Sequence, residues 1–221
     1  MATVLVTGAN RGIGLEYCRQ LTARGDHVIA LCRKAGRELD SLGVRIEAGI
    51  ELTDAFVMDE LMSRLHRQPL DGVILNAGIL NFNGLDDLDP ESIRQQFEVN
   101  ALAPLRLASV LISNLSAGSW IALMTSRMGS IADNTSGGSY GYRMSKAALN
   151  IAGKSLALDL KPKGIAVAIL HPGLVSTRMI NFNPNGISPQ QSVEGLLQRI
   201  DALTLETSGS FWHANGTALP W

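Results

Sequence analysis

Apolar runs rich in β-branched residues alternate with helical patterns along the whole chain. Short apolar runs between turn-forming residues are typical of buried strands, and patterns with a helical period predict the segments between them. Strands are expected at Thr3–Thr7, His27–Cys32, Val44–Ile50, Gly72–Asn76, Trp120–Thr125, Ile165–Leu170 and Ser210–His213. Helices are expected at Ile13–Arg24, Asp54–Arg67, Pro90–Leu115, Ser139–Leu160 and Pro189–Thr204.

This alternation predicts an α/β fold, in which a parallel sheet carries helices on both faces. The run Ile165–Leu170 is apolar throughout, as expected for a strand that is covered on both sides. The sequence has no internal repeat and no low-complexity linker, and 221 residues suit one α/β domain. We therefore expect a single domain over residues 1–221.

Composition and charge argue against several kinds of partner. A formal net charge of −1 and a pI near 6.4 give no electrostatic reason to expect nucleic acid or an anionic membrane. No stretch reaches the roughly 18 apolar residues that a membrane helix needs, and the start "MATVLVTGANRG" lacks the basic region of a signal peptide. Cys18 and Cys32 are expected to be reduced thiols in a cytoplasmic protein, and the four histidines lack metal-ligand spacing, so no metal is expected.

The first predicted strand leads directly into a glycine-rich loop, "TGANRGIG". Glycine at position 8 permits a tight turn, glycine at 12 lets the backbone approach a pyrophosphate, and glycine at 14 allows close helix–strand packing. The GxxxGxG spacing differs from the GxGxxG fingerprint, so a glycine turn without a ligand is the alternative. Its place at the first strand–helix junction favours a dinucleotide site, with contacts from Gly8, Asn10, Arg11, Gly12, Ile13 and Gly14.

The end of the second strand indicates which dinucleotide is bound. An NAD site uses a carboxylate there to hold the ribose 2′-hydroxyl, but this strand ends in "LCRK". The guanidinium of Arg33, with help from Arg11, can instead hold a 2′-phosphate. The sequence therefore predicts NADP, with NAD the less favoured cofactor. The alternative is that Arg33 and Lys34 only begin a solvated loop.

Two tyrosines in "YGYRMSK" precede a single lysine. Tyr142 and Lys146 are four residues apart and share one face of the expected helix, whereas Tyr140 has Met144 at that offset. A nearby ammonium favours the phenolate, so we expect Lys146 to lower the pKa of Tyr142 and prepare it for proton transfer.

Five ordered motifs, "TGANRGIG", "LNAGI", "MTSRMGS", "YRMSK" and "HPGLVST", resemble the short-chain dehydrogenase/reductase family, in particular its compact C-factor-like and carbonyl-reductase-like members. The resemblance covers essentially the whole chain. It implies a Rossmann-type domain with strand order 3-2-1-4-5-6-7. It also implies hydride transfer between NAD(P) and a hydroxyl or carbonyl group of a small molecule. The family often dimerises through helices equivalent to Pro90–Leu115 and Ser139–Leu160, yet compact carbonyl reductases can be monomers. The resemblance is therefore compatible with either a homodimer or a monomer.

The resemblance also assigns roles to individual residues. Tyr142 would be the proton donor and acceptor, and Lys146 would also bind the nicotinamide ribose. Asn100 corresponds to a helix asparagine that is linked to the lysine through water, although a polar residue that caps or kinks the helix is equally plausible. The remaining cofactor contacts would come from Glu51 and Leu52 near the adenine, from Asn76, Ala77 and Gly78 along the adenosine half, and from Pro172, Gly173, Val175 and Thr177 near the nicotinamide.

The serine that orients the substrate has two candidates. Ser126 directly follows the fifth strand but lies sixteen residues before Tyr142, whereas Ser130 is twelve residues before it and lies in a loop. We expect Ser126 to have the role, because the end of a rigid strand positions a hydroxyl better than a loop does. The rival reading of the whole chain is an NADP-binding signalling or interaction protein without catalysis.

Overall fold

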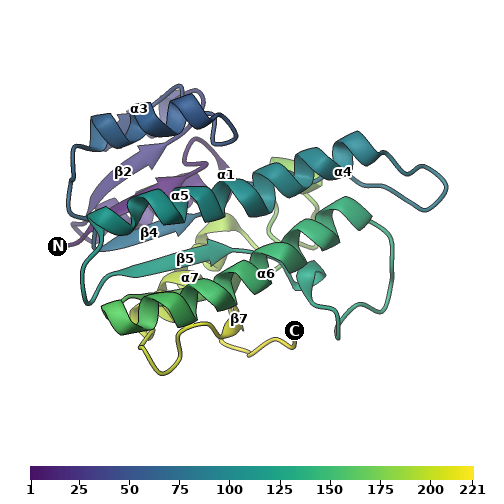
Figure 1. The fold of residues 1–221 in the computed structure, drawn as a ribbon. Helices are drawn as coiled ribbons and strands as arrows, with labels where there is room; N and C mark the ends of the chain where they lie inside the picture. Colours follow the sequence, from purple (N-terminus) through teal and green to yellow (C-terminus); the bar gives the residue numbers. More distant parts are fainter.

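Seven parallel strands form one sheet in the order β3-β2-β1-β4-β5-β6-β7 in the computed structural model, which describes residues 1–221 (Figure 1). The strands are β1 (Thr3–Thr7), β2 (His27–Leu31), β3 (Arg45–Glu47), β4 (Gly72–Leu75), β5 (Trp120–Met124), β6 (Ala166–His171) and β7 (Phe211–His213). The predicted strand order and the Rossmann-type architecture are confirmed.

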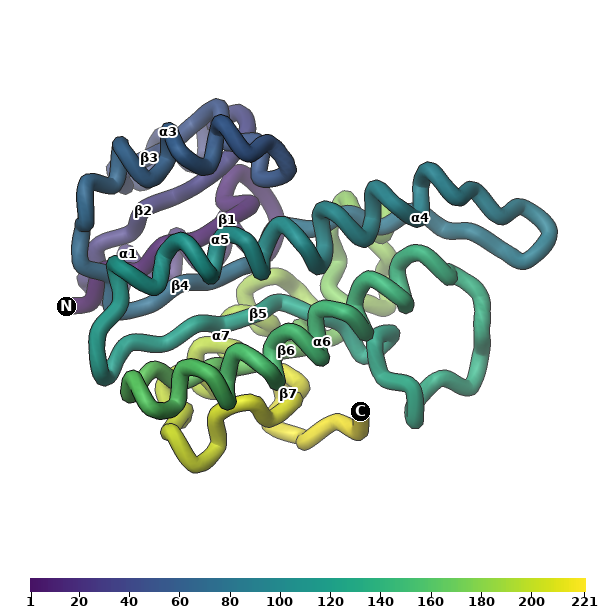
Figure 2. The backbone as a smooth tube through the Cα atoms, viewed as in Figure 1, coloured from purple at the N-terminus to yellow at the C-terminus, as the bar shows by residue number.

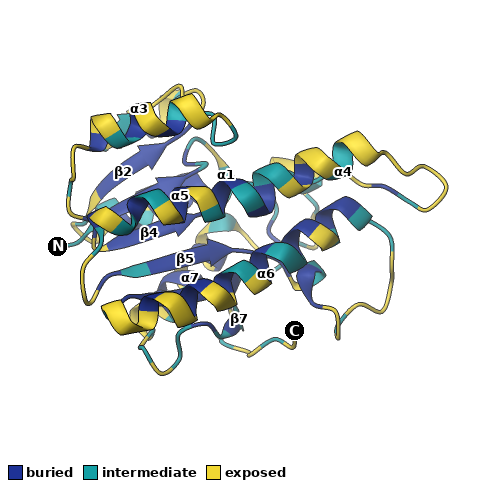
Figure 3. Cartoon of the chain, in the orientation of Figure 1, coloured by how far each residue is buried: buried dark blue, intermediate teal, exposed yellow.

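Helices cover both faces of this sheet (Figure 1). They are α1 (Gly12–Ala23), α2 (Arg37–Asp40), α3 (Ala55–Leu65), α4 (Pro90–Phe97), α5 (Ala103–Leu111), α6 (Tyr140–Leu160) and α7 (Pro189–Asp201). Alternate strand residues face opposite cores: Leu5 and Ile121 pack with α3, α5 and α6, whereas Val6 and Ala122 pack with α1 and α7. Figure 3 shows the consequence, with buried strands and exposed outer faces on the helices.

Three elements differ most from the sequence prediction, and the bounds of several others shift by one to three residues. The third strand covers Arg45–Glu47 instead of Val44–Ile50, because Gly49 turns the chain with a φ of 79° just beyond it. The short helix α2 was not predicted, since four residues are too few to show a helical period. The predicted helix Pro90–Leu115 keeps its course, but a π-helical turn at Glu98–Leu102 separates α4 from α5.

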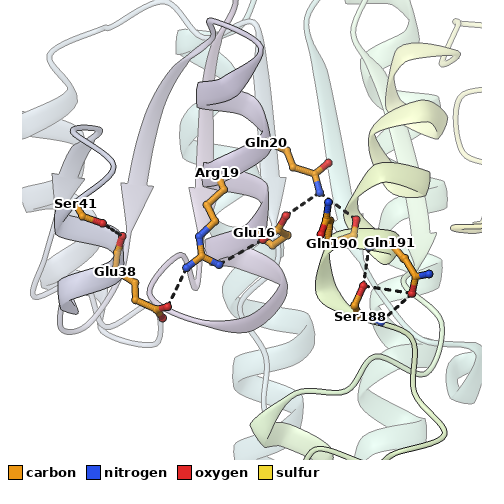
Figure 4. Close-up of polar contacts among 8 residues, drawn as sticks. All are labelled: Glu16, Arg19, Gln20, Glu38, Ser41, Ser188, Gln190 and Gln191. Atoms are coloured by element: carbon orange, nitrogen blue, oxygen red, sulfur yellow. Dashed lines mark hydrogen bonds and ion pairs between the residues drawn. The ribbon is translucent and has the colours of Figure 1, made fainter.

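Polar contacts fix α1 to the two helices beside it (Figure 4). Arg19 forms ion pairs with Glu16 on its own helix and with Glu38 of α2, at N–O distances of 3.4 and 3.0 Å. Gln20 donates a hydrogen bond to the backbone carbonyl of Gln190 at the start of α7, 3.0 Å away. These contacts hold in place the helix whose first turn follows the glycine-rich loop.

All seven strands point in the same direction, so the loops that follow them meet at one edge of the sheet (Figure 1). Two long connections project beyond this carboxyl edge, one leading into α4 and one leading into α6 (Figure 2). The order of the strands reverses between β1 and β4. In open α/β sheets, ligands bind at such a reversal, outside the carboxyl ends of the strands.

Candidate active site

The loop after β1 forms a tight cradle with the loop after β4. Gly8 has a φ of 64°, and a Cβ there would lie 3.0 Å from the Cα of Ala77. A Cβ on Gly14 would lie 2.2 Å from the carbonyl oxygen of Gly8, so a larger residue would push α1 away from the turn. The sequence motifs around Gly8 and Asn76 are therefore neighbours in space, at the point where the strand order reverses.

Thr7, the last residue of β1, links these two loops. Its hydroxyl accepts hydrogen bonds from the backbone N–H groups of Asn76 and Ala77, at 2.9 and 3.0 Å. The side-chain amide of Asn76 donates in return to the backbone carbonyl of Thr7, at 3.0 Å. The sequence analysis missed this residue, although a threonine that ends an otherwise apolar strand was a signal that could have identified it.

The N-terminus of α1 is left open, unlike those of three other helices. Asp54, Asp89 and Ser188 each accept hydrogen bonds from backbone N–H groups in the first turn of α3, α4 and α7. Arg11 precedes α1 and makes no such bond, and no acidic residue lies in the first turn. Free N–H groups and the helix dipole make this position suitable for a phosphate.

Residues near the other end of the chain reach the same cradle. A Cβ on Gly12 would lie 3.4 Å from a methyl carbon of Thr177, so the glycine loop and the loop after β6 are adjacent. Pro172 is held by a hydrogen bond of 2.7 Å from Ser192 of α7 to its carbonyl oxygen. Val175 is buried and pairs with Ile187, which closes the loop that contains Thr177. The glycine-rich loop and the loop after β6 are therefore neighbours at the carboxyl edge of the sheet.

The loops after β2 and β3 form the other end of the cradle. The guanidinium of Arg33 lies 3.6 Å from a carboxylate oxygen of Glu51, and 73% of the Arg33 side chain is exposed. Asn10 donates a hydrogen bond of 3.2 Å to the carbonyl of Lys34, which connects the glycine loop to this basic segment. Leu52 packs against the core beside Glu51. The predicted adenine-side residues Arg33, Glu51 and Leu52 are therefore brought together, with the Arg33 side chain largely exposed.

Ser126 and Ser130 have different environments. Ser126 precedes a short 3₁₀ turn (Arg127–Gly129), and its Oγ accepts a hydrogen bond of 3.1 Å from the backbone N–H of Met128. Its hydroxyl also lies near enough to Tyr142 to lower the pKa of that phenol. The Oγ of Ser130 accepts instead from the backbone N–H of Asp133, inside its own loop. The Ser126 hydroxyl is therefore close to the tyrosine, whereas that of Ser130 is engaged within its loop.

Tyr142 and Lys146 are both buried on α6, with the Lys146 Nζ 5.7 Å from the centre of the Tyr142 ring. Burial raises the pKa of Tyr142 to about 12, and the nearby Ser126 hydroxyl partly opposes this rise. Burial lowers the pKa of Lys146 to about 8, and its Nζ donates to the carbonyl of Met124 at 2.8 Å. Contrary to the expectation of a lowered value, the pKa of Tyr142 is raised in this structure, because burial is the largest influence on it.

Asn100 lies in the π-helical turn and is fully buried. Its Oδ1 accepts from the backbone N–H of Ile79 at 2.8 Å, and its Nδ2 donates to the carbonyl of Ile79 and to the hydroxyl of Ser145. A Cβ on Gly78 would meet both this Oδ1, at 3.1 Å, and the Lys146 Nζ, at 3.6 Å. Both readings of this residue thus have a physical basis: it interrupts the regular helix, and it lies close to the lysine.

No group of three or more His, Cys, Asp or Glu side chains is arranged to hold a metal ion. Likewise, none of the helices combines the length and the apolar character needed to cross a membrane. The two cysteines, Cys18 and Cys32, are buried and free.

Known proteins share this fold and these motifs. A family model described as short chain dehydrogenase matches residues 2–186. The 1-hydroxy-2-glutathionyl-2-methyl-3-butene dehydrogenase of Rhodococcus sp. (strain AD45) is 42% identical over 226 residues, which cover 100% of both chains. The C-signal protein of Myxococcus xanthus is 45% identical over 157 residues, 69% of this chain and 93% of that protein. The NADPH-bound carbonyl reductase from chicken fatty liver superposes with a TM-score of 0.89 at 30% identity, over 100% of this chain and 99% of the other.

The chain belongs to the short-chain dehydrogenase family, since the family model covers most of its length. It is an oxidoreductase of this family that uses a nicotinamide dinucleotide, and the family resemblance predicted from its motifs is confirmed.

The lowered pKa of Lys146 predicts a specific dependence of stability on pH. A lysine in the unfolded chain keeps its proton to about pH 10.5, whereas folded Lys146 loses it above about pH 8. The unfolded state therefore binds more protons in this range, and stability rises with pH. Relative to a Lys146→Met variant, the free energy of unfolding should increase by about 2 kcal/mol between about pH 7.5 and 9.5. Urea denaturation at several pH values measures this, and parallel curves for the two proteins would contradict it.

Proposed function

We propose that the chain catalyses the NADPH-dependent reduction of a carbonyl group to an alcohol, with Tyr142 as the proton donor. The observation that carries this proposal is the buried side chain of Tyr142, which lies beside Lys146 and close enough to Ser126 for that hydroxyl to affect its pKa. A phenol with a pKa of about 12 keeps its proton at neutral pH, so the protein holds the acid that a reduction consumes. NADPH would supply the hydride.

Each side chain then has a distinct task. Because the Ser126 Oγ accepts its hydrogen bond from Met128, its O–H remains free to donate to the substrate oxygen and orient it. Tyr142 would transfer its proton to the same oxygen. The phenolate left behind is buried, and the neighbouring ammonium of Lys146 stabilises it. Lys146 donates one of its three N–H groups to the carbonyl of Met124, so the other two can bind the ribose of the cofactor. Oxidation of an alcohol reverses these steps.

The open N-terminus of α1, the Gly8–Ala77 cradle and the exposed guanidinium of Arg33 fit NADPH better than NADH. The first two features suit any dinucleotide, because both cofactors carry the pyrophosphate. Arg33 distinguishes between them, since a guanidinium can make paired hydrogen bonds to the 2′-phosphate that only NADPH has. NADP(H) bound to relatives of the same fold supports this assignment.

A second candidate function is a signalling role that needs cofactor binding but no turnover. The observation that favours it is the similarity to the C-signal protein of Myxococcus xanthus, which extends over 69% of this chain. The complete set of Ser126, Tyr142 and Lys146 in one buried cluster favours catalysis instead. Oxidation of NADPH by the unmodified protein in the presence of aldehydes and ketones distinguishes the two functions.

The two tyrosines of α6 provide a direct test. Tyr142→Phe removes one hydroxyl and keeps the ring, so folding and NADPH affinity should persist while the turnover number falls by about 10² or more. Tyr140→Phe is the matched control and should change turnover less than about twofold. Steady-state kinetics with a generic ketone measures both variants. Near-normal turnover in Tyr142→Phe would remove the proposed mechanism.

The choice of cofactor can be tested with two neighbouring cations. Arg33→Ala should weaken NADPH binding by about 10- to 100-fold, the range for hydrogen bonds between charged groups, and leave NADH binding unchanged. Lys34→Ala removes an equal charge from the next residue and should have a much smaller effect. Fluorescence titration with both cofactors gives the dissociation constants. Tighter binding of NADH than NADPH by the unmodified protein would refute the assignment.

For the substrate, we propose an alcohol or carbonyl compound conjugated to glutathione, as in the name of the Rhodococcus relative. A hollow of about 530 Å³ lies beside the start of α4 and is lined by Asn81, Phe82, Asn83, Asp89, Glu91, Ser92 and Gln95. Its amides suit the peptide bonds of glutathione, and the carboxylate of Glu91 suits the ammonium group. The hollow is close to the N-terminus of α6, because the carbonyl of Asn83 accepts a hydrogen bond from the N–H of Ser139.

This substrate class predicts a difference between conjugated and simple alcohols. With NADP⁺, a glutathione-conjugated secondary alcohol should have a kcat/KM at least about tenfold above that of its unconjugated parent, since each extra charged hydrogen bond contributes about 1.5–3 kcal/mol. Glu91→Gln should raise the KM of the conjugate alone. Equal kcat/KM values for both alcohols would contradict the substrate class and leave the reductase mechanism intact.

A further inference from the structure

Asn150 lies on α6 one helical turn beyond Lys146 and is buried, with 4% of its surface exposed. Its Oδ1 accepts a hydrogen bond of 2.6 Å from the hydroxyl of Thr125. Its Nδ2 donates a hydrogen bond of 3.2 Å to the carbonyl of Gly129. Thr125 comes immediately before Ser126, and Gly129 ends the turn that follows it. One side-chain amide therefore holds the chain on both sides of Ser126.

The turn Arg127–Gly129 packs tightly against α6. A Cβ on Gly129 would lie 2.6 Å from the carbonyl carbon of Lys146, so the turn rests directly on the backbone of the helix. Thr125 is fixed from the other side as well, because its backbone N–H donates to the carbonyl of Leu170 in β6 at 2.8 Å. A shift of the turn would therefore move the segment that carries the Ser126 hydroxyl.

The chemistry of the amide matches its two partners. The Gly129 carbonyl can only accept, and the Thr125 hydroxyl can donate, so an asparagine that offers one acceptor and one donor satisfies both. Tyr142, Lys146 and Asn150 follow one another at intervals of four residues, so they lie on the same face of α6. The amide thus connects the helix of the tyrosine to the turn of the serine.

We propose that Asn150 is a positioning residue that sets the place of Ser126 relative to Tyr142 and Lys146. The inference rests on the proposed function, in which Ser126 and Tyr142 act on the same substrate oxygen. Asn150 acts through Thr125 and Gly129 and has no contact of its own with the reacting atoms. A displacement of about 1 Å can cost about 10² in rate, so a loosened turn lowers turnover without removing any reacting group.

The experiment compares two substitutions that remove the hydrogen bond between Thr125 and Asn150 with two control substitutions. Asn150→Ala removes the amide, and Thr125→Val removes only the hydroxyl while it keeps the shape of the side chain. Thr125→Ser restores a hydroxyl. Asn114→Ala is the control for stability, because Asn114 is also buried and donates to a backbone carbonyl, that of Gln68, but at the opposite edge of the sheet. Ser126→Ala provides the reference for loss of the serine.

Asn150→Ala and Thr125→Val should lower kcat by about tenfold or more and change the KM for NADPH less than about threefold. Thr125→Ser should recover most of the activity, and Asn114→Ala should lose stability but keep its kcat. In alcohol oxidation, the pH profile of Asn150→Ala should also move to higher pH, because Ser126 lowers the pKa of Tyr142. A purely structural role would not move that profile.

A kcat within about twofold of the parent in Thr125→Val, beside an inactive Ser126→Ala, would overturn the role of Asn150 and leave the proposed function in place. This variant keeps the test valid even where Asn150→Ala fails to fold. Full activity of Ser126→Ala would overturn the role of Ser126, and the positioning role of Asn150 with it, while the proposed function is tested separately by Tyr142→Phe.

Discussion

The ammonium group of Lys146 is buried at the carboxyl end of β5, and the geometry of the site depends on how this charge is accommodated. A buried cation is costly unless it finds a hydrogen-bond acceptor, and here the acceptor is the carbonyl of Met124. The bond ties α6 to the end of β5, where Gly129 has no room for a Cβ. The same close approach buries Tyr142, so desolvation raises the pKa of the phenol while it lowers that of the amine.

Features of the fold that follow from periodicity could be predicted from the sequence. Seven apolar runs gave seven strands, and the four-residue spacing of Tyr142 and Lys146 placed both on one buried face of α6. The loops after the strands gather at one edge because the strands are parallel, so Gly12 and Thr177 become neighbours although they lie far apart in the sequence. The sequence motifs therefore identified residues that lie close together, because the parallel topology places the loops that carry these motifs at one edge of the sheet.

Properties that depend on burial and on backbone hydrogen bonds could not be predicted. The direction of the pKa shift of Tyr142 depends on how much water the surrounding chain removes, and a sequence spacing contains no measure of that. Asn100 interrupts the long helix with a π-helical turn because its side chain bonds both backbone groups of Ile79, a contact with no periodic signal. Asn150 was overlooked for the same reason, since its partners are a backbone carbonyl and a hydroxyl that are distant in sequence.

The N-termini of the helices meet two different requirements: some are capped for stability, and that of α1 is left open for binding. A capping side chain typically contributes about 1 kcal/mol, and α3, α4 and α7 each have one. Helix α1 has no capping side chain. Its N-terminus lies where the strand order reverses, between β1 and β4. Arg11 makes no side-chain hydrogen bond to the first turn, and Glu16 lies beyond that turn, where it pairs with Arg19. A phosphate group would complete this helix, so the missing cap couples the stability of α1 to the binding of the cofactor.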